Sequence, residues 1–335
     1  MKTTQKALVL GAGGGIGGEV ARQLIDAGWQ VRALTRHEPA RQDDAAFEWM
    51  RGDALVPADV LAAARGCSLI VHAVNPPGYR NWAAQVLPML RNTIAASEAA
   101  GASILLPGTV YNYGPDAFPL ASEDAPQHPA TRKGALRVRM EEELAAHCRR
   151  GGRALIVRSG DYFGPRSGNS WFAQALVKPG KPPVRIANPA RPGVGHQWAY
   201  LPDVAAAMVA LVERRSTLAP FARFHLAGHW DADGVTMANA IRRVAACHGI
   251  DARTGSFPWW LVRLAAPFHE TMRELLEMRY LWDQSLRLDN GRLRDTLGTE
   301  PHTPLDMAVE RTLIGLGCIV PAAAVSAPAA ASRKS

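Results

Sequence analysis

A glycine cluster near the start of the chain has the spacing of an anion-binding loop. Residues 8–18 read Leu-Val-Leu-Gly-Ala-Gly-Gly-Gly-Ile-Gly-Gly. The apolar run at 6–10 predicts a buried parallel strand, and an amphipathic helix follows the glycines at once. Such a turn presents free backbone N–H groups and the positive end of a helix to a pyrophosphate. The spacing of Gly11, Gly14 and Gly17 therefore predicts a dinucleotide site, although a non-nucleotide α/β domain can also contain a glycine-rich turn.

The end of the second predicted strand bears on the choice between NAD and NADP. An acidic residue there bonds the ribose hydroxyls and repels a 2′-phosphate, whereas a basic residue accepts that phosphate. Here strand 30–34 is followed by Thr35 and Arg36, with no carboxylate at its end. Thr35 can donate to a phosphate oxygen, and Arg36 can form charge-assisted bonds with it. We predict NADP and leave NAD open, because Arg36 could also be a solvated surface charge.

Two further loops are expected at the same edge of the sheet. Asp53 follows a predicted third strand at 47–50 and can accept a hydrogen bond from an adenine amino group, although an Asp in a turn often bonds only its own backbone. Strand 68–73 ends before Asn75, at the edge where doubly wound folds bind ligands. The predicted cofactor-binding residues are Gly11, Gly14, Gly15, Ile16, Gly17, Thr35, Arg36, Asp53, Ala73, Val74 and Asn75.

The elements that must position these residues alternate between strand and helix. We expect strands at 6–10, 30–34, 47–50, 68–73, 103–107, 153–158 and 222–227, and helices near 17–27, 57–65, 81–100, 133–150, 202–213, 235–248 and 258–282. This order predicts an α/β fold with a Rossmann-type doubly wound parallel sheet and a smaller C-terminal substrate-binding domain. We assign 1–160 and 198–228 to the NAD(P)-binding domain, 161–197 and 229–318 to the substrate domain, and 319–335 to a disordered tail.

Composition limits the other functions. The net charge is +8, yet the basic residues are dispersed and form no stripe interleaved with aromatic residues, so nucleic-acid binding is not expected. There is neither a signal peptide nor a long apolar run, and we predict a cytoplasmic protein without a membrane partner. Four scattered cysteines and the isolated pair His225 and His229 predict neither a disulfide framework nor a metal site.

Several further motifs match one known family. The chain resembles the extended and atypical short-chain dehydrogenase/reductase superfamily, in the branch that contains NAD-dependent epimerases and dehydratases. The resemblance covers about residues 5–318 and implies a Rossmann domain, a C-terminal substrate pocket and a homodimer formed through the fourth and fifth helices. It rests on the glycine spacing, Asp53, Val71-His72-Ala73, Asn92-Thr93, Tyr113-Gly114-Pro115, Arg158-Ser159-Gly160-Asp161-Tyr162-Phe163-Gly164-Pro165 and Tyr200-Leu201-Pro202-Asp203.

The catalytic residues depart from the pattern of this family. The resemblance implies a Ser or Thr with a Tyr-x-x-x-Lys pair, in which the tyrosine is the general acid or base. The hydroxyl position falls on Thr109, but Lys133 stands in the tyrosine place and Arg137 in the lysine place. A lysine can transfer protons when nearby cations disfavour its charge, and it is the base in isoflavone reductase-like relatives. Lys133 could otherwise be a surface charge at a helix start, and Arg137 can hold a ribose or a phosphate. Tyr111 and Tyr162 are further candidate donors, or packing residues.

The sequence therefore favours an NADP(H)-dependent oxidoreductase acting on a small carbonyl or hydroxyl substrate, with Thr109, Lys133 and Arg137 as candidate catalytic residues. One alternative is a regulatory protein that senses NADP without chemistry. A nucleotide-sugar epimerase or dehydratase is the third hypothesis. It requires a Tyr-x-x-x-Lys pair and an acidic residue after the second strand, and the chain lacks both.

Overall fold

The central element of the fold is a parallel sheet of seven strands. The computed structural model describes residues 5–37, 46–76 and 82–321. Within them the sheet order is β11-β7-β5-β4-β1-β2-β3, and every neighbouring pair is parallel. The strands are β1 (Lys6–Leu10), β2 (Gln30–Thr35), β3 (Glu48–Arg51), β4 (Leu69–His72), β5 (Ser103–Thr109), β7 (Ala154–Ser159) and β11 (Phe221–His225). All seven predicted strands are confirmed, with ends shifted by at most two residues.

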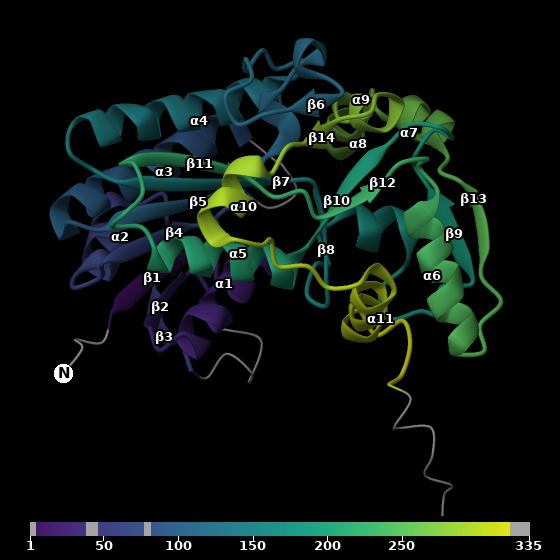
Figure 1. The fold of residues 1–335 in the computed structure, drawn as a ribbon, viewed down its shortest axis with the longest axis horizontal. Coiled ribbons are helices and arrows are strands. Elements are labelled where there is room, and N and C mark those ends of the chain that lie inside the picture. The colour runs from purple at the N-terminus through teal and green to yellow at the C-terminus, as the bar shows by residue number, and fades with distance from the viewer. Residues whose placement is uncertain (1–4, 38–45, 77–81, 322–335) are drawn as a thin grey trace, which may run out of the picture.

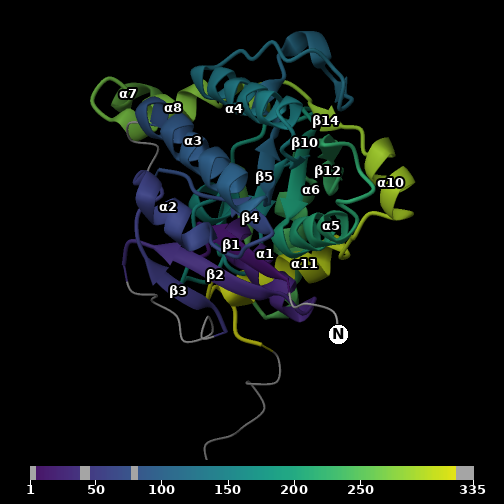
Figure 2. The same cartoon turned by 90° about the vertical axis from the view of Figure 1, so that its left-hand side faces the viewer.

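Helices cover both faces of this sheet (Figures 1 and 2). One face packs on α1 (Gly15–Asp26) and α5 (Leu201–Glu213), and the other on α2 (Pro57–Ala64), α3 (Trp82–Ala100) and α4 (Arg132–Arg149). The alternation of side chains along β1 shows the two layers. Val9 belongs to the core under α1 and α5, whereas Leu8 and Leu10 belong to the core under α2. This is the doubly wound Rossmann-type arrangement expected from the alternating pattern.

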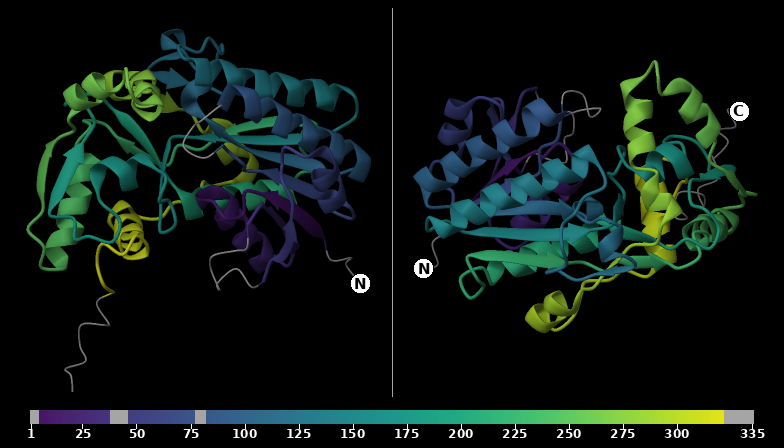
Figure 3. Two further views of the ribbon diagram at one scale, coloured as in Figure 1. Left: turned by 180° about the vertical axis from the view of Figure 1, so that it is seen from behind. Right: turned by 90° about the horizontal axis from the view of Figure 1, so that it is seen from above.

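A second group of elements, mostly green in Figure 3, lies to one side of the central sheet. It is built around the small sheet β12-β10-β8 and the parallel pair β13-β9, with a separate apolar core. Its strands are β8 (Asp161–Phe163), β9 (Arg185–Asn188), β10 (His196–Tyr200), β12 (His229–Asp231) and β13 (Arg253–Ser256), and its helices are α6 (Thr236–Cys247), α7 (Trp259–Ala265), α8 (Glu270–Glu277), α9 (Tyr280–Asp283) and α11 (Leu305–Gly315).

Short elements connect the two groups. The helical turns η3 (Val110–Asn112) and η4 (Pro115–Ala117) follow β5, and η5 (Phe172–Leu176) follows β8. The strand β6 (Leu120–Ala121) pairs in parallel with β14 (Arg287–Leu288), and α10 (Gly291–Leu297) packs near β11. The chain thus crosses between the groups several times, and the division into domains at 160, 197 and 228 stays a prediction.

Two expectations about the C-terminal part are wrong. The helix predicted over 258–282 is interrupted twice and forms α7, α8 and α9. The first interruption follows from Pro267, which cannot continue α7. The tail does not begin at 319, since Ile319 is only 7% exposed and packs in the second core. Its remaining residues from 322 onward lie outside the described residues. No helix in the described ranges has the length and apolarity needed to cross a membrane.

Candidate active site

A cleft of about 680 Å³ opens at the carboxyl ends of β1, β2, β4 and β5. It is lined by ten of the eleven predicted cofactor residues and by all three predicted catalytic residues. Gly17 is the exception. Parallel strands end at one edge, so loops far apart in the sequence meet there, as the ligand-binding rule for open α/β sheets requires. The structure therefore places all of these residues but Gly17 at one cleft, and their roles in binding and catalysis stay predictions.

The glycines after β1 serve two different structural roles. Gly11 has a φ of +92°, and a Cβ there would lie 2.5 Å from the carbonyl oxygen of Ala73. A Cβ on Gly17 would lie 2.3 Å from the carbonyl oxygen of Gly11. These two glycines allow the loop to pack against itself and against β4, so Gly17 supports the cleft from beneath. By contrast, a Cβ on Gly13 would meet nothing within 4 Å, and this glycine lines the cleft.

The start of α1 is suited to an anion. The helix begins at Gly15 with no side-chain cap and no acidic residue in its first turn. Its first N–H groups therefore lack helical partners, and the positive end of its dipole is not neutralised locally. Together with the open surface over Gly13, this geometry fits a pyrophosphate group lying across the loop.

The adenosine end of the cleft is formed by β2 and the loop after β3. Arg36 is exposed and lines the cleft. The Thr35 hydroxyl donates to the carbonyl of His37 at 2.6 Å, so it is held by its own turn. Asp53 Oδ1 accepts the N–H of Leu55 at 2.9 Å, also within a turn. Arg36 is thus an exposed cation at this end of the cleft.

The predicted reaction residues meet at the other end of the cleft. Thr109 ends β5, and its hydroxyl accepts the N–H of Tyr111 at 3.3 Å. Lys133 lies in the first turn of α4, with a side chain only 5% exposed. The Arg137 guanidinium lies one turn further on, 5.3 Å from the centre of the Trp82 ring. All five residues line the cleft, so α4 brings two cations to the same place as the β5 hydroxyl.

An acidic partner for Lys133 comes from the second group of elements. Lys133 Nζ lies 2.8 Å from Glu274 Oε2, and the Glu274 side chain is 14% exposed. Glu274 lies on α8. Sequence reasoning missed this residue, because neither its spacing nor its neighbours link it to Lys133. The two side chains thus form a largely buried ion pair between α4 and α8.

Tyr162 is the second phenol in the cleft besides Tyr111. It lies on β8, and burial raises the pKa of its hydroxyl, while a side-chain hydrogen bond with Ser159 and the charge of Arg137 lower it. A phenol with a raised pKa remains neutral near pH 7. Tyr162 therefore lines the cleft, and its role as a hydrogen-bond donor to a ligand stays a prediction.

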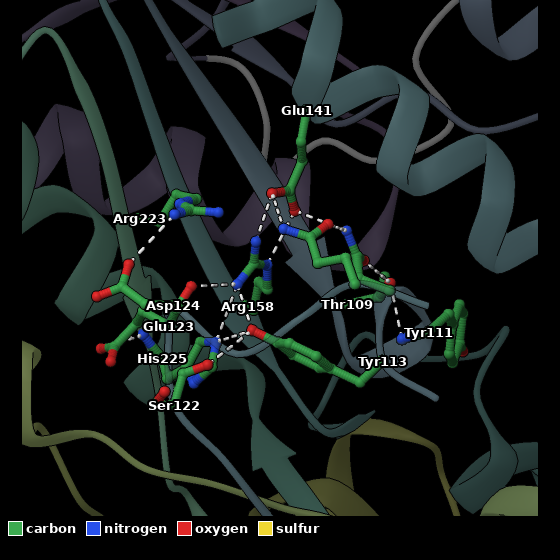
Figure 4. Close-up of polar contacts among 12 residues, drawn as sticks. Thr109, Tyr111, Tyr113, Ser122, Glu123, Asp124, Glu141, Arg158, Arg223 and His225 are labelled. Atoms are coloured by element: carbon green, nitrogen blue, oxygen red, sulfur yellow. Dashed lines mark hydrogen bonds and ion pairs between the residues drawn. The ribbon is translucent and has the colours of Figure 1, made fainter. Parts of the chain in front are cut away.

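A buried polar network supports Thr109 from behind (Figure 4). The Thr109 hydroxyl lies 3.4 Å from Asn112 Oδ1, and Asn112 Nδ2 donates to Glu141 Oε1 at 2.9 Å. Arg158 Nε donates to the same carboxylate at 2.9 Å, and Arg158 also donates to the Tyr113 hydroxyl. Arg158 is fully buried, so its charge depends on Glu141. The network fixes the turn after β5 relative to α4 and β7.

His225 completes this network and is not placed as a metal ligand. Its Nε2 lies 2.7 Å from the Tyr113 hydroxyl. Burial, followed by the charge of Arg158, lowers the pKa of His225 to about 3, and burial raises the pKa of Tyr113 to about 12. Across the described ranges, no group of three or more His, Cys, Asp or Glu side chains could hold a metal ion.

Comparison with known proteins identifies the family. The model of the NAD-dependent epimerase/dehydratase family matches residues 7–227. The chain belongs to this family. Among curated proteins, none matches the sequence significantly.

Solved structures share its fold at low sequence identity. A candidate epimerase from Burkholderia cenocepacia J2315 has a TM-score of 0.74 and 20% identity over 95% of this chain and 99% of its own. UDP-glucuronic acid 4-epimerase from Bacillus cereus, solved with UDP-glucuronic acid and NAD, has a TM-score of 0.72 and 16% identity, with coverages of 93% and 99%. UDP-N-acetylglucosamine 4-epimerase from the same organism has a TM-score of 0.69 and 16% identity, with coverages of 92% and 94%. These matches support the Rossmann-like fold of this family member.

Proposed function

We propose that this family member is an NADP(H)-dependent oxidoreductase acting on a small carbonyl or hydroxyl substrate. The observation that carries the proposal is the continuity of one cleft from the glycine loop and Arg36 to Thr109 and Lys133. The glycine loop and the start of α1 would hold the pyrophosphate, and Arg36 would pair with a 2′-phosphate. Bound reduced nicotinamide would supply a hydride to the carbonyl carbon.

The residues at the reaction end have complementary roles in carbonyl reduction. The Thr109 hydroxyl would donate a hydrogen bond to the carbonyl oxygen and orient it. The Lys133 ammonium would give that oxygen a proton, so that an N–H bond breaks as the O–H bond of the alcohol forms. Arg137 would hold the nicotinamide ribose or a phosphate. A charged Lys133 suits this direction, because a proton donor must begin the step protonated.

A carbonyl screen with matched variants tests the proposal. NADPH consumption would be followed with aldehydes, ketones and keto acids for the natural chain, Lys133→Met and the surface control Lys178→Met. We expect turnover with the natural chain and the control, and a loss of about 10²–10⁴-fold in Lys133→Met with NADPH binding retained. NADPH binding without turnover on any carbonyl would favour the sensing role instead.

Nucleotide-sugar epimerisation is the second candidate, and family membership favours it. Its weakness is chemical, since Lys133 and Arg137 occupy the places of the tyrosine and lysine that the family resemblance implies. Incubation with UDP-sugars and NAD, followed by separation of the epimers, distinguishes the two candidates. Conversion of a UDP-sugar without net consumption of the dinucleotide would replace the oxidoreductase proposal.

A further inference from the structure

The start of α4 carries charges that disfavour a helix N-terminus. Thr131 caps the helix by accepting the N–H of Gly134 at 3.0 Å. The first turn then contains Arg132 and Lys133 and no acidic residue. Positive side chains at this end oppose the helix dipole, and burial of Lys133 adds the cost of desolvating its charge. A site of this kind requires negative charge from elsewhere in the fold.

Two carboxylates of α8 supply that charge. Figures 1 and 2 show α8 beside one end of α4. Glu277 Oε1 accepts the backbone N–H of Arg132 at 2.5 Å, and Glu274 Oε2 lies 2.8 Å from Lys133 Nζ. Glu274 and Glu277 are three residues apart and therefore lie on one face of α8. Glu274 alone of the two contacts the lysine that lines the cleft.

The docking of α8 depends on such contacts more than on an apolar core. None of its eight residues is fully buried. Helices with few buried apolar contacts belong to the less stable parts of a fold, so polar contacts have a larger share in holding them. The ion pair thus joins a weakly packed helix of the second group of elements to the reacting end of the cleft.

We propose that Glu274 is a positioning residue that holds Lys133 as an ammonium directed into the cleft, so that docking of α8 prepares the proton donor. This inference rests on the proposed function. In the reduction, bound reduced nicotinamide would supply the hydride, and the carbonyl oxygen would take a proton from the Lys133 ammonium, whose N–H bond breaks as the O–H bond forms. The lysine then regains a proton from water while Glu274 remains a carboxylate throughout.

Other charged or titratable groups near Lys133 have different placements. Glu277 accepts the backbone N–H of Arg132, and the largely exposed Arg132 guanidinium lies 3.6 Å from Glu274 and 3.8 Å from Glu277, so Glu274 contacts both cations at the start of α4. Arg137 on α4, Tyr111 on η3 and Tyr162 on β8 line the same cleft. The Glu274 carboxylate is the negative group that forms the 2.8 Å ion pair with Lys133 Nζ, and Glu274→Gln removes that pair.

Chemical labelling tests the inference without any turnover. An amine-reactive acylating reagent attacks only the neutral amine, and mass spectrometry can follow the peptide that contains Lys133 in ligand-free protein. In Glu274→Gln we expect Lys133 to react on the order of tenfold faster than in the natural chain. Glu277→Gln is the matched control on the same helix face and should leave the rate unchanged, and Glu274→Asp should restore slow labelling. Equal Lys133 labelling in all four proteins would overturn the inference.

The pH dependence of carbonyl reduction gives a second readout. In Glu274→Gln the alkaline limb of the kcat profile should move to lower pH, while KM for the dinucleotide stays within about twofold. A uniform loss of kcat at every pH would contradict the positioning role. If the natural chain has no turnover, the proposed function fails, but the labelling experiment still decides whether Glu274 holds Lys133. If Glu274→Gln unfolds, Glu274→Asp takes its place in the test. Labelling of Lys133 in folded Glu274→Asp at the rate of an exposed lysine would also overturn the inference.

Discussion

Replacing Arg36 by Ala should weaken NADPH binding and leave NADH binding unchanged. Arg36 lies at the end of β2, where a 2′-phosphate would enter the cleft. The Thr35 hydroxyl and Asp53 Oδ1 instead form hydrogen bonds within their own turns. A hydrogen bond to a charged group contributes about 1.5–3 kcal/mol. Because Arg36 is exposed, solvent reduces this to about 1–2 kcal/mol, which corresponds to roughly a 5–30-fold increase in Kd.

Titration calorimetry with NADPH and NADH at two salt concentrations measures this effect. Arg65→Ala, an exposed arginine after α2 and outside the cleft lining, is the matched control. The loss in Arg36→Ala should shrink at high salt, because screening weakens an exposed ion pair in the natural chain. Equal losses for NADPH and NADH would refute the reasoning, since Arg36 would then act on a part common to both dinucleotides.

Three other predictions concern the site and its support. Thr109→Val should lower kcat for carbonyl reduction by about 10²-fold while Thr109→Ser stays within about tenfold, and similar rates for both would remove the hydroxyl from the mechanism. Glu141→Gln should cost about 3–5 kcal/mol of unfolding free energy in urea, because it leaves the buried charge of Arg158 without its carboxylate. Burial lowers the folded-state pKa of His72 to about 3, below its ordinary value of 6.5, so its contribution to stability is present above pH 6.5 and is lost as the pH falls. The loss should be about 1.4 kcal/mol per pH unit between pH 6 and pH 4, and His72→Asn should unfold with a shallower pH dependence.

The strands and the position of the cleft could be predicted from local sequence patterns. A parallel strand covered on both faces appears in the sequence as a short continuous apolar run, as in Ala7 to Leu10. The order of the strands in the sheet follows from such runs only together with the rule that β-helix-β crossovers are right-handed. The glycine pattern located the loop that lines the cleft. It did not separate Gly13, which faces the open cleft, from Gly17, which packs beneath it, because that distinction depends on the three-dimensional path of the loop.

The remaining features depend either on a contact between distant segments or on local geometry that the predicted pattern did not reveal. The partner of Lys133 is Glu274, and no local pattern links the start of α4 to α8. The hydroxyl of Thr35 is held by its own turn, which residue type alone does not reveal. The end of α7 follows from Pro267, a break that the prediction of one helix over 258–282 overlooked.

The central claim is that the glycine loop holds a phosphorylated dinucleotide, and thermal unfolding with NADPH, NADP⁺, NADH and NAD⁺ tests it most directly. The comparison protein is Gly13→Val, since a side chain at Gly13 meets no neighbour within 4 Å yet enters the cleft. Ligand at 100 times its Kd stabilises a protein by about 2.7 kcal/mol. The account predicts an increase in Tm with NADPH and NADP⁺ for the natural chain, and an unchanged Tm with every dinucleotide for an equally stable Gly13→Val. No increase with any of the four, or the same increase in both proteins, would contradict it.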